Sequence, residues 1–149
     1  MKKNKCACCS SMGKINKIKA VEDAVMALCV LAISSDGEVN SKEMDSLYKI
    51  LSVSPIFKNS KKTKEDYINC ILSSIAPRTR GEVISECVKA IPQKLRATAY
   101  AWIYFALKSD KKVIHPEHKF LDEITKHFKL PGALAGKIKA VVEIISRDK

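Results

Sequence analysis

The side chains best able to do chemistry stand in one short stretch of the first third of the chain. Asp36, Glu38 and Asn40 place carboxylate or amide oxygens at alternate positions, as the first ligand positions of a calcium-binding loop do. Glu43 follows three residues later and could add an oxygen from the start of a helix. The later positions of the calcium-loop pattern differ, so the metal type stays open. We predict a divalent cation (Ca, Mg, Mn or Zn) at this stretch, residues 36–43, which we call the acidic corner.

The same pattern returns near the other end of the chain. With a shift of 74 residues, six pairs are identical: Ser35 and Ser109, Asp36 and Asp110, Val39 and Val113, Glu43 and Glu117, Leu47 and Leu121, Ile50 and Ile124. The second copy keeps Asp110 and Glu117 as donors but has Lys112 and Ile114 at the other two positions. Each copy follows an apolar segment, so we predict two pseudo-symmetric helix–loop–helix halves.

The two repeated glutamates also have a purely structural interpretation. Pro116 is suited to the first position of a helix, which makes His115 the expected cap and, by register, Ser41 the cap of the first copy. Glu43 and Glu117 then lie in a first helical turn, where a carboxylate interacts with unpaired amides and the helix dipole, worth roughly 0.3–1 kcal/mol each.

Two histidines offer a second choice of metal site. His115 and His118 are three residues apart, a spacing at which two imidazoles can share one helix face and bind Zn²⁺ or Ni²⁺. Histidines at the start of a surface helix often have no ligand, which is the alternative.

The residues around the first corner resemble a known motif. The motif begins with an apolar helix and continues with Ser-Asp-Gly-Glu-Val-Asn-Ser-Lys-Glu over residues 35–43. A helix with Leu47 and Ile50 on its inner side follows. This arrangement resembles the motif of the TerB family of tellurite-resistance proteins. The resemblance spans about residues 21–145. It implies an all-helical domain of two pseudo-symmetric halves, a role in tellurite or general chemical stress, and metal binding through acidic loop residues.

The charge of the chain is strongly basic and uneven. Lys and Arg number 27 against 16 Asp and Glu, a net charge of +11. Six of these lysines precede residue 20, and no acidic residue does: Lys2, Lys3, Lys5, Lys14, Lys17 and Lys19. We predict a flexible basic arm over residues 1–19 and a TerB-like helical domain over 20–149. Our alternative function is that this basic protein binds a polyanion, either nucleic acid or an anionic membrane surface, non-specifically.

Cysteines divide into two groups. Cys6, Cys8 and Cys9 lie in the arm and could bind a soft metal, carry an acyl chain, or have no specific role. Cys29, Cys70 and Cys87 fall on apolar helical stripes, and we expect them to be reduced core residues.

Apolar spacing predicts seven helices and no strand. We expect them at residues 21–33, 42–51, 64–76, 80–91, 92–108, 116–128 and 133–146, with a solvated lysine-rich loop over 52–64. The first and fifth segments are apolar on nearly every side, so both should be central. We assign the aromatic residues of the fifth, from Tyr100 to Phe105, to the core.

The sequence lacks the common catalytic motifs. A Gly-rich phosphate loop, a nucleophile elbow and His-Glu-x-x-His are absent, so we predict a protein that is not an enzyme. We also find no signal peptide and no 18-residue apolar run. The expected location is the cytoplasm, with peripheral membrane contact as an alternative, and the expected partners are proteins of a stress-response or membrane-associated complex rather than nucleic acid.

Overall fold

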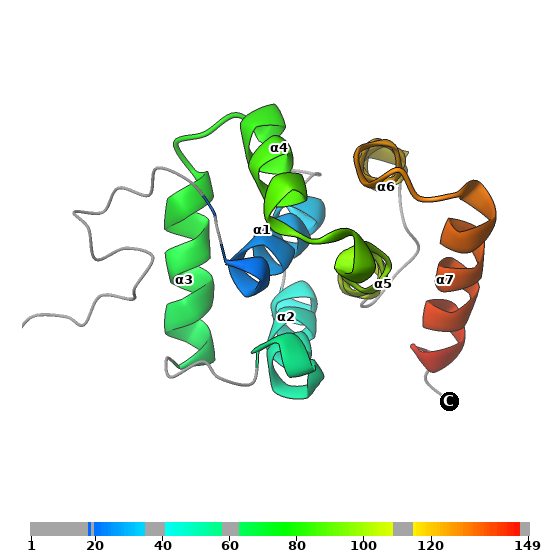
Figure 1. Ribbon diagram of the computed structural model, residues 1–149. Coiled ribbons are helices and arrows are strands. Elements are labelled where there is room, and N and C mark those ends of the chain that lie inside the picture. Colours follow the sequence, from blue (N-terminus) through cyan, green and yellow to red (C-terminus); the bar gives the residue numbers. More distant parts are fainter. Residues whose placement is uncertain (1–17, 19, 35–40, 58–62, 109–114, 147–149) are drawn as a thin grey trace, which may run out of the picture.

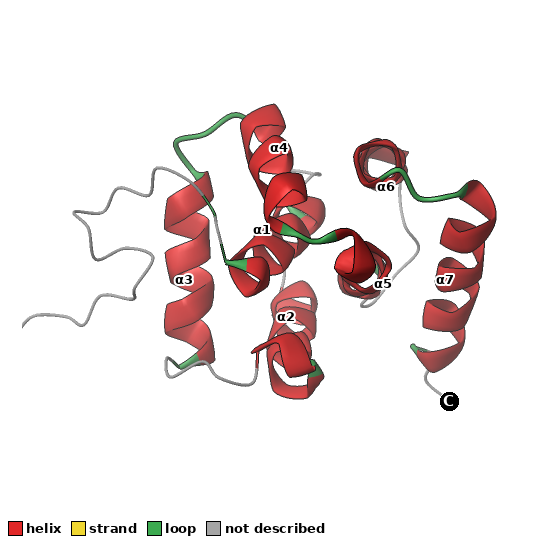
Figure 2. Cartoon of the chain, in the orientation of Figure 1, coloured by secondary structure: helices red, strands yellow, loops and turns green. Residues whose placement is uncertain are grey.

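The computed structural model is built of helices. It describes residues 18, 20–34, 41–57, 63–108 and 115–146, with His115 described by its backbone alone. The elements are α1 (Val21–Ile33), α2 (Ser41–Val53), η1 (Pro55–Phe57), α3 (Lys64–Ile75), α4 (Arg80–Ala90), η2 (Gln93–Leu95), α5 (Arg96–Leu107), α6 (His115–Phe128) and α7 (Gly132–Ile145). These ranges contain seven α-helices, two short 3₁₀ turns and no strand (Figure 2). The predicted all-α class is confirmed.

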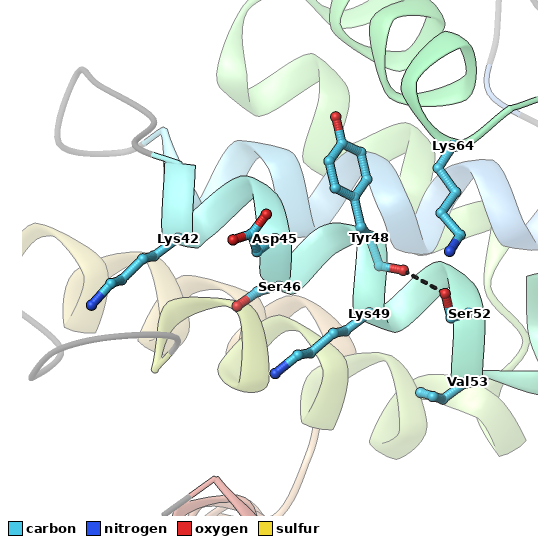
Figure 3. A pocket seen from close by; sticks show the side chains of 8 residues that line it. All are labelled: Lys42, Asp45, Ser46, Tyr48, Lys49, Ser52, Val53 and Lys64. Atoms are coloured by element: carbon cyan, nitrogen blue, oxygen red, sulfur yellow. Dashed lines mark hydrogen bonds between the residues drawn. The ribbon is translucent and has the colours of Figure 1, made fainter. Parts of the chain in front are cut away.

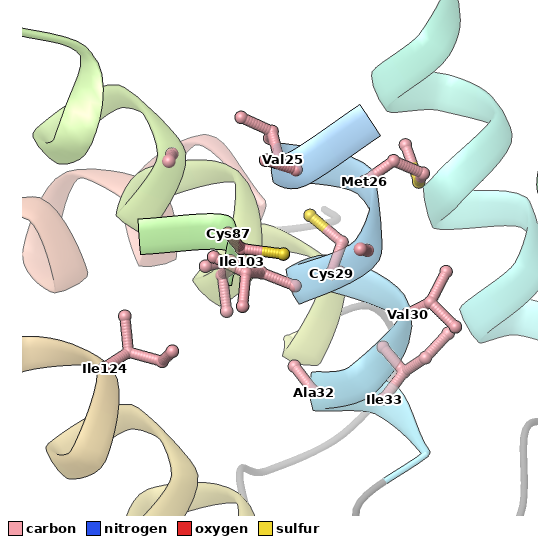
Figure 4. Packing of buried hydrophobic residues seen from close by; sticks show 14 of the residues in the cluster. Val25, Met26, Cys29, Val30, Ala32, Ile33, Cys87, Ile103 and Ile124 are labelled. Atoms are coloured by element: carbon pink, nitrogen blue, oxygen red, sulfur yellow. The ribbon is translucent and has the colours of Figure 1, made fainter. Parts of the chain in front are cut away.

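Helix α1 lies in the middle of the molecule. Its neighbours are α2, α3, α4, α5 and α6, with α7 at the far side of α5 (Figure 1). Nine of its thirteen residues are buried: Ala24, Val25, Met26, Ala27, Leu28, Cys29, Val30, Ala32 and Ile33. Figure 4 shows two of them, Met26 and Cys29, directed toward opposite sides of α1. The helix that is apolar on nearly every side is therefore central, as the sequence predicts.

Several helix starts are encoded locally. The Thr63 hydroxyl accepts a hydrogen bond of 3.0 Å from the amide of Asp66 at the start of α3. At the start of α4, Thr79 and Glu82 each bond to the amide of the other, forming a capping box. Helix α2 begins at Ser41 and helix α6 at His115, one residue earlier than predicted. Ser41 and His115 are therefore the first helical residues and not the caps. Helix ends differ by about one residue between definitions of a helix.

Two segments differ from the sequence prediction. The fifth helix begins at Arg96 rather than residue 92, because η2 turns the chain first. The expected loop over 52–64 contains η1, and its Phe57 is buried with its ring edge-on to Tyr67, at 6.2 Å between centroids. This segment is therefore partly core, since the aromatic ring packs against the start of α3.

Tyrosine hydroxyls join two pairs of helices. Tyr67 of α3 donates to the carboxylate of Asp23 of α1, and Tyr104 of α5 donates to Glu143 of α7, both at 2.7 Å. Burial, followed by the neighbouring carboxylate, raises the pKa of both tyrosines. Both hydroxyls therefore stay protonated at neutral pH and hold α3 against α1 and α7 against α5.

Helix ends follow the 74-residue shift of the sequence. Helix α1 ends at Ile33 and α5 at Leu107, and α2 begins at Ser41 and α6 at His115. The superposition of two complete halves remains a prediction.

Candidate functional site

The two repeated glutamates are both buried. Glu43 in the first turn of α2 is 1% exposed, and Glu117 in the first turn of α6 is 0% exposed. A carboxylate taken out of water is costly unless hydrogen bonds or positive charge compensate it. The first turn of a helix provides part of that compensation through its amides and dipole. The repeat thus places one buried carboxylate at the start of each of two helices.

The other predicted ligands of the acidic corner lie outside the described residues. These are Asp36, Glu38, Asn40 and Asp110. Within the ranges that the structure describes, no group of three His, Cys, Asp or Glu side chains lies close enough to hold a metal ion. The cation site therefore stays a prediction, with Glu43 and Glu117 as its described members.

The second-choice histidines lie on the first turn of α6. His115 is its first residue and His118 is exposed. Because the side chain of His115 is not described, the pairing of the two imidazoles stays a prediction.

The described cysteines differ from one another. Cys29 and Cys87 are free, buried thiols, and Figure 4 shows their sulfur atoms facing each other between α1 and α4. Burial, with a smaller contribution from Glu86, raises the pKa of Cys87 to about 12, so its thiol is protonated and a poor nucleophile near neutral pH. Cys70 is buried but disulfide-bonded. The prediction of a reduced core thiol is thus wrong for Cys70.

The basic arm is described at one point only. Lys2, Lys3, Lys5, Lys14, Lys17 and Lys19, together with Cys6, Cys8 and Cys9, lie outside the described residues. Ile18, which lies between Lys17 and Lys19, is 7% exposed, and its amide donates to Glu86 of α4 at 3.1 Å. The chain is therefore attached to α4 before α1 begins.

A lysine-lined pocket on α2 was not predicted from the sequence. It is open, has a volume of about 550 Å³, and is lined by Lys42, Asp45, Ser46, Tyr48, Lys49, Ser52, Val53 and Lys64. Figure 3 shows Lys42 and Lys49 extending from α2 in the same direction, and Lys64 approaching from the start of α3. The lining contains three ammonium groups and one carboxylate, so the pocket has a net positive charge. We call it the α2 pocket. The seven-residue spacing of Lys42 and Lys49 indicates a shared helix face, but the position of Lys64 depends on how α3 packs.

Comparison with known proteins adds no relative. The chain matches no family model, no curated protein and no solved structure. The resemblance to the TerB family therefore continues to rest on the repeated motif alone. Among the described helices, none has the length and apolarity needed to cross a bilayer.

Proposed function

We propose that this chain is a non-catalytic helical module whose ligand is a divalent cation at the acidic corner. The observation that carries the proposal is the burial of Glu43, with Glu117 buried at the equivalent step of the repeat. The carboxylate of Glu43, at the start of α2, can serve as one oxygen ligand of such a cation. Asp36, Glu38 and Asn40 supply further oxygens in the adjoining segment. A place in tellurite or chemical stress response, among proteins of a stress-response or membrane-associated complex, is implied by the TerB resemblance alone.

Metal titration tests this proposal. Because a ligand of the native state stabilises it, each of Ca²⁺, Mg²⁺, Mn²⁺ and Zn²⁺ is added to wild type and to Asp36→Ala during thermal unfolding. At a concentration about 100 times Kd, the cognate ion should add about 2.7 kcal/mol, which raises Tm by roughly 5–10 °C for a chain of this size. Asp36→Ala should lose this shift.

The histidine pair provides the control for the metal experiment. His118→Ala should retain the full shift in Tm if the acidic corner holds the ion. Loss of the shift in His118→Ala, with retention in Asp36→Ala, would move the site to the start of α6. If Tm rose equally in wild type, Asp36→Ala and His118→Ala, or rose in none of them, cation binding at both the acidic corner and the start of α6 would be excluded.

A second candidate function is favoured by the α2 pocket. Its three lysines offer a positive surface for phosphate or sulfate groups of a polyanion. Such binding is electrostatic, so it should weaken steeply with salt. Under this proposal the polyanion surface includes the α2 pocket of the helical domain as well as the lysines of the arm that the sequence predicts.

Heparin chromatography separates the pocket from general basicity. Lys42→Glu with Lys49→Glu should elute at clearly lower salt than wild type, because it reverses two of the three pocket charges. Lys119→Glu with Lys126→Glu is the matched control, since both lysines are exposed, seven residues apart on α6, and give the same net charge. Equal elution of the two double variants would show that only net charge matters and would exclude the pocket.

A further inference from the structure

Two free thiols face each other inside the molecule. Cys29 of α1 and Cys87 of α4 are both 0% exposed, and Figure 4 shows their sulfur atoms directed toward one another between the two helices. Helix α1 packs on α4 and α5 more extensively than on any other helix that the structure describes. The thiol pair therefore lies in one of the two main helix contacts of the fold, with one cysteine on each helix.

Packing alone does not require sulfur at position 29. Shifted by 74 residues, Cys29 corresponds to Ile103 of α5, which is also 0% exposed. An aliphatic side chain thus fills the equivalent buried position of the second copy. Trp102 and Phe105 of α5 are half-buried instead, and they line an apolar groove between α5 and α7. Our assignment of these two aromatics to the core was therefore wrong in part.

The thiol pair is protected while the helices are packed. Burial raises the pKa of both cysteines, and the neighbouring Cys87 adds to this effect at Cys29. A thiol reacts as its thiolate, and neither sulfur can be reached by a reagent from solvent. Reaction of either thiol therefore requires α4 to separate from α1.

Polar contacts hold the same part of α4. Glu86, the residue before Cys87, accepts a hydrogen bond from the amide of Ile18 at 3.1 Å and forms an ion pair with Arg78 at 2.7 Å. The Ile18 contact joins α4 to the chain just before α1. A covalent bond between the two thiols would hold α4 to α1 at the same level of the helix.

We propose that Cys29 and Cys87 form a redox lock: when α4 separates from α1, a small-molecule disulfide oxidises the two thiols to a disulfide that joins the helices. The inference does not depend on cation binding. One cysteine of the pair attacks a sulfur of oxidised glutathione, which forms a mixed disulfide and releases one glutathione. The other cysteine then attacks the protein sulfur of the mixed disulfide and releases the second glutathione. The protons of the two cysteines pass to the two leaving thiolates, and the two electrons that the pair loses reduce oxidised glutathione.

The redox lock should stabilise the fold. The new bond closes the loop from residue 29 to residue 87, which contains α2 and α3. A closed loop of this length restricts the unfolded chain, so we expect Tm to rise by roughly 5–10 °C. Reduction with dithiothreitol should return Tm to its original value.

Peptide mapping tests the redox lock in the full chain. The protein is incubated with excess oxidised glutathione below its Tm, the remaining thiols are blocked with iodoacetamide, and the protein is digested with trypsin without reduction. Cleavage after lysine and arginine places Cys29 in peptide 20–42, Cys87 in peptide 81–89 and Cys70 in peptide 65–78. We expect peptides 20–42 and 81–89 to be joined, in protein that migrates as a monomer on non-reducing electrophoresis.

The matched control moves one thiol by one residue. Cys87→Ala with Val88→Cys keeps the number of thiols but turns the second one about 100° around α4. Compared at the same interval below its own Tm, this double variant should form the joined peptides at least about tenfold more slowly, because a disulfide needs closely placed Cβ atoms. Equal rates would show that pairing occurs in the unfolded chain and would overturn the proposal. So would glutathione bound to each cysteine separately, joined peptides found only in a dimer, or no reaction at either thiol.

Discussion

Replacing Glu117 with lysine should lower the free energy of unfolding by about 3–5 kcal/mol, the range found for an uncompensated buried charge. The side chain is fully buried. The substitution also puts a positive charge at the positive end of the α6 dipole, where it is unfavourable. Urea denaturation followed by circular dichroism measures the change, and failure of the variant to fold would be the extreme form of the same result.

The matched control for this experiment is Glu65→Lys. Glu65 also lies in the first turn of a helix, α3, but is exposed. Its replacement should cost no more than about 1 kcal/mol, because water screens the dipole interaction at the surface. If Glu117→Lys and Glu65→Lys lowered the free energy of unfolding equally, burial would not explain the effect at Glu117. The idea that a buried carboxylate stabilises the start of α6 would then be wrong.

Truncating Leu28 to alanine should cost about 2–5 kcal/mol, because the change leaves a cavity in the middle of the packed helices. Leu28 is 0% exposed on α1, the helix around which the others are arranged. Leu72→Ala is the comparison, since the same atoms are removed from a residue that is 37% exposed, and it should cost less than about 1 kcal/mol. The difference between the midpoints of unfolding tests the central position of α1.

Equal effects of the two leucine truncations would contradict that position. They would indicate that the interior around α1 can collapse onto the missing side chain, as a loosely packed core would.

Much of the fold could be predicted because helical signals are local. Three signals act within one or two helical turns: the spacing of apolar residues, the N-terminal threonines Thr63 and Thr79, and the prolines between segments. Together they predict seven helices, whose ends are close to those observed. The fifth helix and the 52–64 segment differ because 3₁₀ turns at Gln93–Leu95 and Pro55–Phe57 depend on packing as much as on local preference.

The candidate sites were less predictable because they depend on distant contacts. The sequence identified Glu43 and Glu117 from the repeat, but equally allowed them to be exposed first-turn residues. The aromatic stripe with Trp102 and Phe105 has the same spacing as a core stripe, so periodicity could not show that its outer side is open. The contribution of Lys64 to the α2 pocket required the packing of α3 beside α2.

The sequence by itself determined the helices, the 74-residue repeat and the central position of the most apolar segment, because each follows from side-chain types at fixed spacing along one helix. The tertiary structure alone decided which surfaces are covered. It buried the glutamates and left an apolar groove open between α5 and α7, because the exposure of a helix face depends on the neighbours that pack against it.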